Sequence, residues 1–263
     1  MTWFDALIMA IVEGLTEFLP VSSTGHMIIT QGILGFESTE FTKAFLVNIQ
    51  FGTILSVLVL YWKRFFQSID FYLKLFVAFL PAAIIGFLAS DFIDQLLESV
   101  LVVAIMLVLG GIFLLFVDRL FSDSEKASDE QKISFKKALF IGFFQVIAMI
   151  PGVSRSAATI VGGMAQKLNR KQAAEFSFFL AVPTMFAASA YKLLQNYHSI
   201  TKENIDLLLF GNLIGFLVAI VAIKSFIGYV TKYGFKVFGW YRIIVGMIII
   251  ILIMAGVNLN IVG

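Results

Sequence analysis

Long apolar runs dominate this chain, and their lengths predict membrane-spanning helices. At a rise of 1.5 Å per residue, each run can cross about 30 Å of hydrocarbon. The mean hydropathy of +0.96 and the 14% share of charged residues are incompatible with a soluble globule of 263 residues. The six runs cover residues 45–62, 72–89, 100–117, 176–194, 207–226 and 238–257.

Two further apolar segments, residues 1–35 and 138–166, are interrupted at their middles by Pro, Ser and Gly. Neither half of either segment is long enough to span a bilayer alone. We call them the first and second broken segments. Between the two halves of the chain lies a polar stretch, residues 121–137, which we predict to be a cytoplasmic loop.

The two broken segments resemble each other at a constant offset of 132 residues. Ala6-Leu7 matches Ala138-Leu139, Glu13 matches Gln145, and Val21-Ser22 matches Val153-Ser154. We therefore predict an internal duplication, with a first repeat over 1–120 and a second over 138–263. Each repeat has one broken segment and three spanning helices. Because three is odd, the repeats would have opposite orientations, which gives an all-α, polytopic membrane protein with an inverted repeat.

The placement of basic residues favours broken segments that are re-entrant hairpins, returning to the side from which they enter. Under that topology only Lys43, Lys192 and Lys202 fall on one face, with Arg155 set aside. By the positive-inside rule the other face is cytoplasmic, and the first hairpin opens to the outside. If both broken segments spanned, the bias would shrink. The cytoplasmic face receives Lys63, Arg64, Lys74, Arg119, Lys126, Lys132, Lys136, Lys137, Lys167, Arg170, Lys171, Lys224, Lys232, Lys236 and Arg242.

A polar island, EGLTEFLPVSSTGH at positions 13–26, interrupts the first broken segment. Glu13 and Glu17 are four residues apart, which on a helix places both carboxylates on one face. Two such anions in a dry site repel each other, so either one keeps a proton or a cation lies between them. A divalent metal completed by phosphate oxygens is one such cation. The alternative is a helix face exposed to water at the membrane surface.

The second half of this island predicts a turn followed by a new helix. Pro20 ends one helix, and Ser22, Ser23 or Thr24 can cap the next, whose free amide groups would bind an anion. Alternatively, these hydroxyls only satisfy the broken backbone. His26 lies within one turn of Ser23 and could accept the proton of its hydroxyl or offer one to a leaving oxygen. The alternative is a histidine that only makes hydrogen bonds in the core.

A second polar island, PGVSRSAAT at positions 151–159, contains Arg155 between Ser154 and Ser156, with Thr159 one turn later. An arginine cannot lose its proton at this depth, so it needs a permanent anion. That anion is either a substrate phosphate gripped by both arms of the guanidinium or a carboxylate of Glu13 or Glu17. Arg155 is interpreted here as the only arginine outside a loop or a helix end.

Carboxylates, a hydroxyl beside a histidine, and an arginine together suit hydrolysis at phosphorus. A lipid phosphate or diphosphate is the natural substrate for a chain of this composition. A transporter or flippase could use the same residues to bind an anion without cleaving it. A lipid phosphatase of the acid-phosphatase type is a further alternative, but it needs a second histidine, and His198 has no supporting Arg or Asp motif. The absence of cysteine excludes disulfides and thiolate chemistry.

On these two islands the sequence resembles the bacterial undecaprenyl-diphosphate phosphatase family, the bacitracin-resistance type. Its signatures are a Glu-rich stretch that ends in Pro-Val-Ser-Ser-Thr-Gly-His and a Pro-Gly-x-Ser-Arg-Ser-x-x-Thr stretch, and both are complete here. The resemblance extends over essentially the whole chain. It implies hydrolysis of undecaprenyl diphosphate to the monophosphate carrier lipid at the outer face of the cytoplasmic membrane.

The resemblance also implies roles for individual residues. Glu13 and Glu17 would bind a divalent cation, Mg²⁺ or Ca²⁺, or position water, while Ser23 and His26 would serve the chemical step. Arg155 would hold the diphosphate, with Ser22, Thr24, Ser154, Ser156 and Thr159 as further binding residues. The attacking group is Ser23, His26 or an activated water; we favour Ser23 as nucleophile, with His26 assisting. The expected partners are the lipid substrate and the bilayer rather than nucleic acid, and the Gly110-Gly111 and Gly162-Gly163 pairs allow close helix contacts within one chain or in a homodimer.

Overall fold

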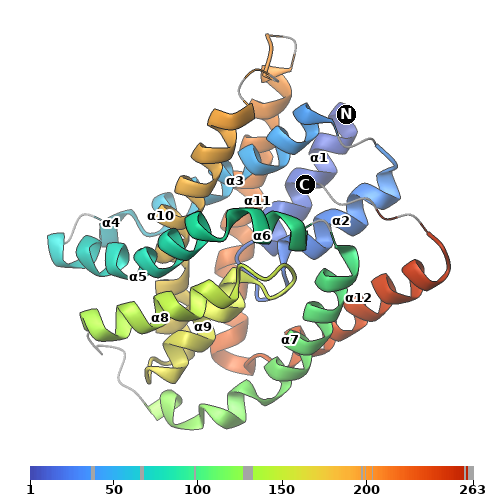
Figure 1. Ribbon diagram of the computed structural model, residues 1–263. Helices are drawn as coiled ribbons and strands as arrows, with labels where there is room; N and C mark the ends of the chain where they lie inside the picture. Colours follow the sequence, from blue (N-terminus) through green and yellow to red (C-terminus); the bar gives the residue numbers. More distant parts are fainter. Residues whose placement is uncertain are drawn as a thin grey trace.

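The structure is a computed structural model in which every regular element of the described residues is a helix (Figure 1). The predicted all-α class is confirmed for this part of the chain. The described residues are 1–36, 39–65, 68–97, 99–126, 133–196, 198, 200–202, 204–257 and 259.

Six of these helices are long and apolar enough to cross a membrane, and each overlaps one of the predicted runs. Several extend beyond the apolar run because polar residues continue the helix, as at Glu40 and Arg170. The six are α3 (Glu40–Leu60), α5 (Ile69–Leu88), α7 (Val100–Leu120), α10 (Arg170–Asn196), α11 (Ile205–Tyr233) and α12 (Lys236–Met254). The prediction of a multi-pass helical membrane protein is therefore confirmed.

Each broken segment forms two short helices joined by a turn. The first contains α1 (Trp3–Thr16) and α2 (Ser23–Leu34), joined by residues 17–22, the first turn. The second contains α8 (Phe135–Ile147) and α9 (Arg155–Ala165), joined by residues 148–154, the second turn. The remaining elements are the connecting helices α4 (Trp62–Phe65), α6 (Ser90–Leu97) and the 3-10 helix η1 (Ser122–Lys126). Residues 127–132 of the predicted polar loop lie outside the described part.

The backbone at the start of α2 and of α9 has the same unusual conformation. Ser22 and Ser154, the residues that precede these helices, have φ of 68° and 75°. L-residues other than glycine rarely adopt positive φ, and strain of this kind costs about 1–3 kcal/mol. The two serines occupy matching positions at the offset of 132 residues.

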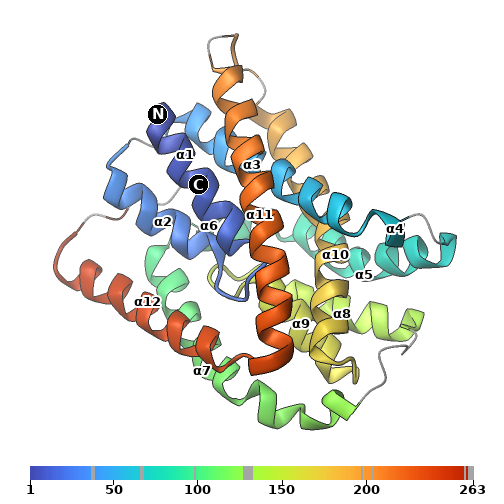
Figure 2. The ribbon, with the colours of Figure 1, turned by 180° about the vertical axis from the view of Figure 1, so that it is seen from behind.

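Small residues allow the long helices to pack closely. α7 and α12 pack side by side, and a Cβ on Gly111 would lie 2.7 Å from the carbonyl oxygen of Gly239. In α9, a Cβ on Gly162 would lie 2.8 Å from the Cβ of Phe144. Both glycine pairs thus make close contacts within the chain, and the homodimer stays a prediction. Elsewhere α1 packs against α11 and α8 against α5, while α3 contacts both α10 and α11 (Figure 2).

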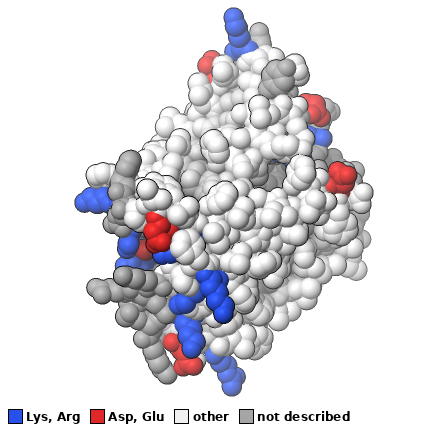
Figure 3. Space-filling view, turned by 60° about the vertical axis from the view of Figure 1, so that its left-hand side comes forward, with Lys and Arg blue, Asp and Glu red and all other residues white. Residues whose placement is uncertain are grey.

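In Figure 3, most of the visible Lys and Arg side chains gather at the lower left of the molecule, and only isolated charged side chains lie near its upper end.

Asp118, at the C-terminus of α7, joins three parts of the bundle. Its Oδ1 accepts a hydrogen bond from Arg170 Nε at 2.9 Å. Its Oδ2 accepts the backbone N–H of Phe235 at 2.8 Å. This carboxylate therefore joins α7, α10 and the junction between α11 and α12.

Candidate active site

The two turns meet inside the helical bundle. Ser156, near the start of α9, donates its hydroxyl to the carbonyl oxygen of Leu19, which belongs to the first turn, at 2.6 Å. Its hydroxyl also lies 3.1 Å from that of Ser154, which in turn caps α9 by accepting the N–H of Ala157. Ser156 therefore links the two broken segments, whereas Ser154 caps α9, and both hydroxyls satisfy backbone groups that the breaks leave open.

Arg242 fixes both turns at once, and the sequence interpretation of this residue was wrong. It was assigned to the charged cytoplasmic face, but it lies inside α12 and its side chain is 0% exposed. Nη1 donates to the carbonyls of Pro20 (3.2 Å) and Val153 (2.9 Å), one in each turn. Nη2 donates to the carbonyls of Gly152 (2.7 Å) and Met106 (3.1 Å). Arginine suits this position because its planar fork has five donors, which are enough for the carbonyls of the two turns that no helix satisfies and for the Met106 carbonyl within α7.

Arg155 and Glu17 form an ion pair between the two broken segments. Arg155 Nη2 lies 2.9 Å from Glu17 Oε1, and both side chains are largely buried. The second carboxylate oxygen, Glu17 Oε2, accepts the hydroxyl of Ser23 at 2.6 Å. One carboxylate thus contacts a hydroxyl that could attack and a cation that could bind phosphate.

The rest of the Arg155 guanidinium is held by α10 and by the first turn. Nη1 donates to the carbonyl of Ser177 at 3.1 Å, and the guanidinium carbon lies 5.7 Å from the ring centre of Phe18. Nε is buried and has no hydrogen-bond partner. Thr159 supports this arrangement, because its hydroxyl lies 2.6 Å from that of Ser177 and donates to the carbonyl of Arg155. An unpaired N–H on a buried cation is available to an incoming anion.

His26 contacts Tyr241 and the Ser22 backbone, whereas the Ser23 hydroxyl is bound to Glu17. Nδ1 lies 2.8 Å from the carbonyl oxygen of Ser22, which can only accept, so Nδ1 carries the hydrogen. Nε2 lies 2.7 Å from the hydroxyl of Tyr241, with the two rings stacked at 5.4 Å. Sequence reasoning missed Tyr241. Its position one residue before Arg242, in an apolar run, is the only signal that could have indicated it.

Glu13 is the most buried carboxylate of the site, with 1% exposure. Its Oε1 has no hydrogen-bond partner, and its charged neighbours are Glu17 and Arg155. Gln145, at the matching position of the second broken segment, is also buried, and its Nε2 lacks a partner. Within the described residues no group of three or more His, Asp or Glu side chains could hold a metal by itself. Any cation here would therefore be shared between Glu13, Glu17 and oxygens of a bound molecule.

A polar cavity of about 190 Å³ lies between the two turns, α3 and α10. Of the ten predicted site residues, six line it, and Glu13, His26, Ser156 and Thr159 lie behind or beside its walls. Gln50 and Met185 line the cavity but were not predicted, although Gln50 is a polar residue within an apolar run. The six predicted residues that line it are Glu17, Ser22, Ser23, Thr24, Ser154 and Arg155.

The fold defines a multi-pass helical membrane protein, and the Arg155–Glu17 ion pair lies in its polar cavity. Residues 6–248 match the family model described as bacitracin resistance protein BacA, and the chain belongs to that family. A relative from Flavobacterium johnsoniae named undecaprenyl-diphosphatase is 55% identical and covers 96% of each chain. Proteins of the same name from Porphyromonas gingivalis and Bdellovibrio bacteriovorus are 55% and 54% identical; the alignments cover 98% and 100% of this chain, and 99% and 100% of the relatives.

Proposed function

We propose that this protein is a membrane phosphatase that hydrolyses undecaprenyl diphosphate to undecaprenyl phosphate and inorganic phosphate. The observation that carries the proposal is the Glu17 carboxylate, which accepts the Ser23 hydroxyl at 2.6 Å and the Arg155 guanidinium at 2.9 Å. A nucleophile, its base and an anion-binding group thus converge on one cavity. The names of the relatives agree with this chemistry, and the product would be the carrier lipid for envelope polymers.

In the proposed first step, the Ser23 hydroxyl oxygen attacks the terminal phosphorus of the diphosphate. Glu17 Oε2 takes the hydroxyl proton, a bond forms between Ser23 Oγ and phosphorus, and the bridging P–O bond breaks. The bond electrons leave with the lipid monophosphate. In the second step, the protonated Glu17 gives its proton to the Ser23 oxygen as the bond between that oxygen and phosphorus breaks. Water forms the new bond to phosphorus and passes a proton to Glu17, and release of this proton to solvent restores the carboxylate. His26 is placed here as a residue that fixes Ser22 and the start of α2, because Nδ1 and Nε2 contact Ser22 and Tyr241.

Arg155 would bind the phosphate oxygens during both steps. In the structure its Nη2 contacts Glu17, and its Nε is an unpaired donor. A bound diphosphate can therefore take up the free donor and replace Glu17 at Nη2, which leaves the carboxylate available as a base. Ser22, Thr24 and Ser154 line the same cavity and can bind the remaining oxygens.

A divalent cation, Mg²⁺ or Ca²⁺, fits the acidic pair of this site. Glu13 Oε1 is a buried acceptor without a donor beside a second carboxylate, which is the environment that hard cations with oxygen ligands occupy. Glu13 and Glu17 would hold the ion, with phosphate oxygens completing the shell. When bound, it would neutralise charge on the diphosphate oxygens.

We infer that the two repeats are inverted and that both broken segments are re-entrant. Two observations support the duplication. Ser22 and Ser154 have similar positive φ, and each broken segment packs on a long helix of the other repeat, α1 on α11 and α8 on α5. When the buried Arg242 is left out of the count, the topology assigns fourteen basic residues to the cytoplasmic face and three to the other. This bias supports the predicted orientation. The cavity would then open to the outer face of the bacterial cytoplasmic membrane.

Phosphate release from undecaprenyl diphosphate by the purified protein tests the function. We expect release by the wild type, and loss of release in Ser23→Ala with retention of substrate binding. Ser68→Ala, a change at an exposed serine that caps α5, is the matched control. Substrate binding without any release by the wild type, with Mg²⁺ or Ca²⁺ supplied, would instead indicate a transporter or flippase.

A further inference from the structure

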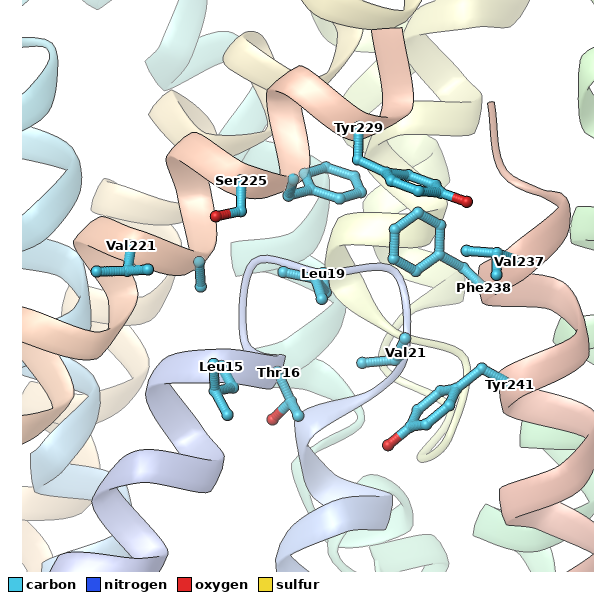
Figure 4. A pocket seen from close by; sticks show the side chains of 12 residues that line it. Leu15, Thr16, Leu19, Val21, Val221, Ser225, Tyr229, Val237, Phe238 and Tyr241 are labelled. Atoms are coloured by element: carbon cyan, nitrogen blue, oxygen red, sulfur yellow. The ribbon is translucent and has the colours of Figure 1, made fainter. Parts of the chain in front are cut away.

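A second hollow, an apolar groove of about 560 Å³, lies on the other side of the first turn (Figure 4). Its walls come from the end of α1, the first turn, α11 and the start of α12. Leu15, Val221 and Val237 on its rim are 44%, 63% and 49% exposed, whereas Val21, Ala222 and Phe226 at its floor are buried. The groove therefore opens to the bilayer, and its volume falls within the usual range for ligand sites, about 300–1,000 Å³.

The groove and the polar cavity share a wall. In the first turn, Leu19 and Val21 project into the groove between α11 and α12 (Figure 4). Ser22, the last residue of the turn, and Ser23, the first of α2, line the cavity instead. Tyr241 also lines the groove, and its hydroxyl contacts His26 Nε2 at a hydrogen bond that is exposed. Only this short segment separates the two hollows, so an amphiphile whose head lay in the cavity would reach the groove by crossing it beside His26 and Tyr241.

We propose that the groove is the binding site for the isoprenoid chain of the lipid diphosphate. This inference rests on the proposed function and adds to it a second part of the substrate site. Burial of apolar chain surface contributes about 25 cal/mol per Å², so such a groove can supply much of the affinity for the lipid. Tyr241 would fix the position of the diphosphate relative to the isoprenoid chain, because its ring lines the groove and its hydroxyl contacts His26.

The chain of the substrate fits this position better than a second copy of the protein does. A protein partner seated on α11 and α12 would cover the exposed contact between His26 and Tyr241, and with it the passage to the cavity. The floor is also deep, since Ala222 is 5% and Phe226 2% exposed, as expected for a site that receives a narrow, flexible chain. Ordinary bilayer lipid is the remaining occupant, and the second experiment below distinguishes it.

A matched pair of tryptophan variants on α11 tests the groove. Val221→Trp would fill its rim, whereas Leu217→Trp introduces the same side chain one turn away, at a position of 50% exposure that does not line it. With undecaprenyl diphosphate we expect Val221→Trp to raise KM about tenfold, equivalent to about 1.4 kcal/mol, at unchanged kcat. With farnesyl diphosphate, a shorter isoprenoid, we expect a smaller rise. Leu217→Trp should behave as wild type with both substrates.

Equal kinetics of the two variants would contradict the groove as the binding site of the isoprenoid chain. The phosphatase assignment would stand, since wild-type phosphate release tests it separately. The same conclusion follows if Val221→Trp impairs both substrates equally. As a second measurement, an isoprenoid diphosphate with a photoreactive group in its chain should label the peptide around Val221 to Tyr229. Competition by undecaprenyl diphosphate but not by a phosphatidylcholine of similar mass supports the proposal. Equal competition by the phospholipid would identify the groove as a site of ordinary bilayer lipid.

Discussion

The guanidinium of Arg155 and the carboxylate of Glu17 lie 2.9 Å apart, although 138 positions separate them in the chain. The pair joins the start of α9 to the first turn, so the two polar islands of the sequence form one site. Neither charge could remain at this depth alone, because burial of an unpaired ion is costly. An anion that enters the cavity therefore has to compete with Glu17 for Arg155.

Replacing Arg155 by Lys should lower kcat by about a hundredfold, although the charge is retained. Lysine is a point charge and cannot contact Glu17, Ser177 and a phosphate from one planar group. Steady-state phosphate release measures the effect. Arg119→Lys, at an exposed position near the end of α7, is the control and should turn over normally. Near-normal activity of the Arg155 variant would assign that arginine a purely structural role.

Glu13→Gln and Glu17→Gln should shift the metal titration of activity to higher concentration. Each change removes one negative charge from the acidic pair, and a weaker pair holds a divalent cation less tightly. Glu17→Gln should also lower kcat at saturating metal, because its base is lost, whereas Glu13→Gln should recover more of its rate. Glu40→Gln, which alters an exposed carboxylate on α3, serves for comparison. If both site variants titrate like wild type, neither residue belongs to the metal shell.

Replacing Arg242 by Lys should lower both thermal stability and activity. The variant keeps at most part of the contacts to Pro20, Gly152 and Val153, so carbonyls of both turns would lose their donors. Each lost bond to a charged group costs about 1.5–3 kcal/mol. The unfolding midpoint in detergent is the measurement, with Arg64→Lys at an exposed position as reference. An unchanged midpoint would show that the turns do not depend on this residue.

Cysteines placed at Ser122 and Thr201 should react with impermeant reagents from opposite sides of the membrane. Between them lie the second broken segment and α10, so a re-entrant segment gives one crossing and a spanning segment gives two. The chain has no cysteine of its own, which makes the labelling unambiguous. Labelling from the same side would contradict the re-entrant arrangement and with it the inverted repeat.

The long helices could be predicted because their cause is local. A continuous apolar run must satisfy its backbone hydrogen bonds within itself when it lies in lipid, and only a helix does so without partners. The same reasoning located both breaks, since Pro, Ser and Gly interrupt the runs at residues 17–22 and 148–154. The candidate residues were found in the same way, because polar side chains are rare in such segments and stand out.

The contacts among those residues could not be predicted in the same way. Ser23 lies three residues before His26, yet its hydroxyl is bound to Glu17, whereas the Nε2 of His26 is bound to Tyr241. Arg242 was misplaced because it lies near the start of the apolar run 238–257 and was therefore counted as a residue of a helix end. Its five donors are required by carbonyls of two turns and of α7, and that requirement exists only once the turns have met.

The sequence by itself therefore determined the number of long helices, the two breaks and most of the ionisable groups of the site, because hydrophobic run length and polar interruptions are properties of single segments. Only the tertiary structure decided which groups face one another. It placed Arg155 on Glu17, Ser23 on the same carboxylate, and Arg242 across both turns, because each pairing depends on the packing of helices that are distant in the chain. The apolar groove beside them arises for the same reason, since its walls belong to three separate parts of the chain, residues 15–21, 221–229 and 237–241.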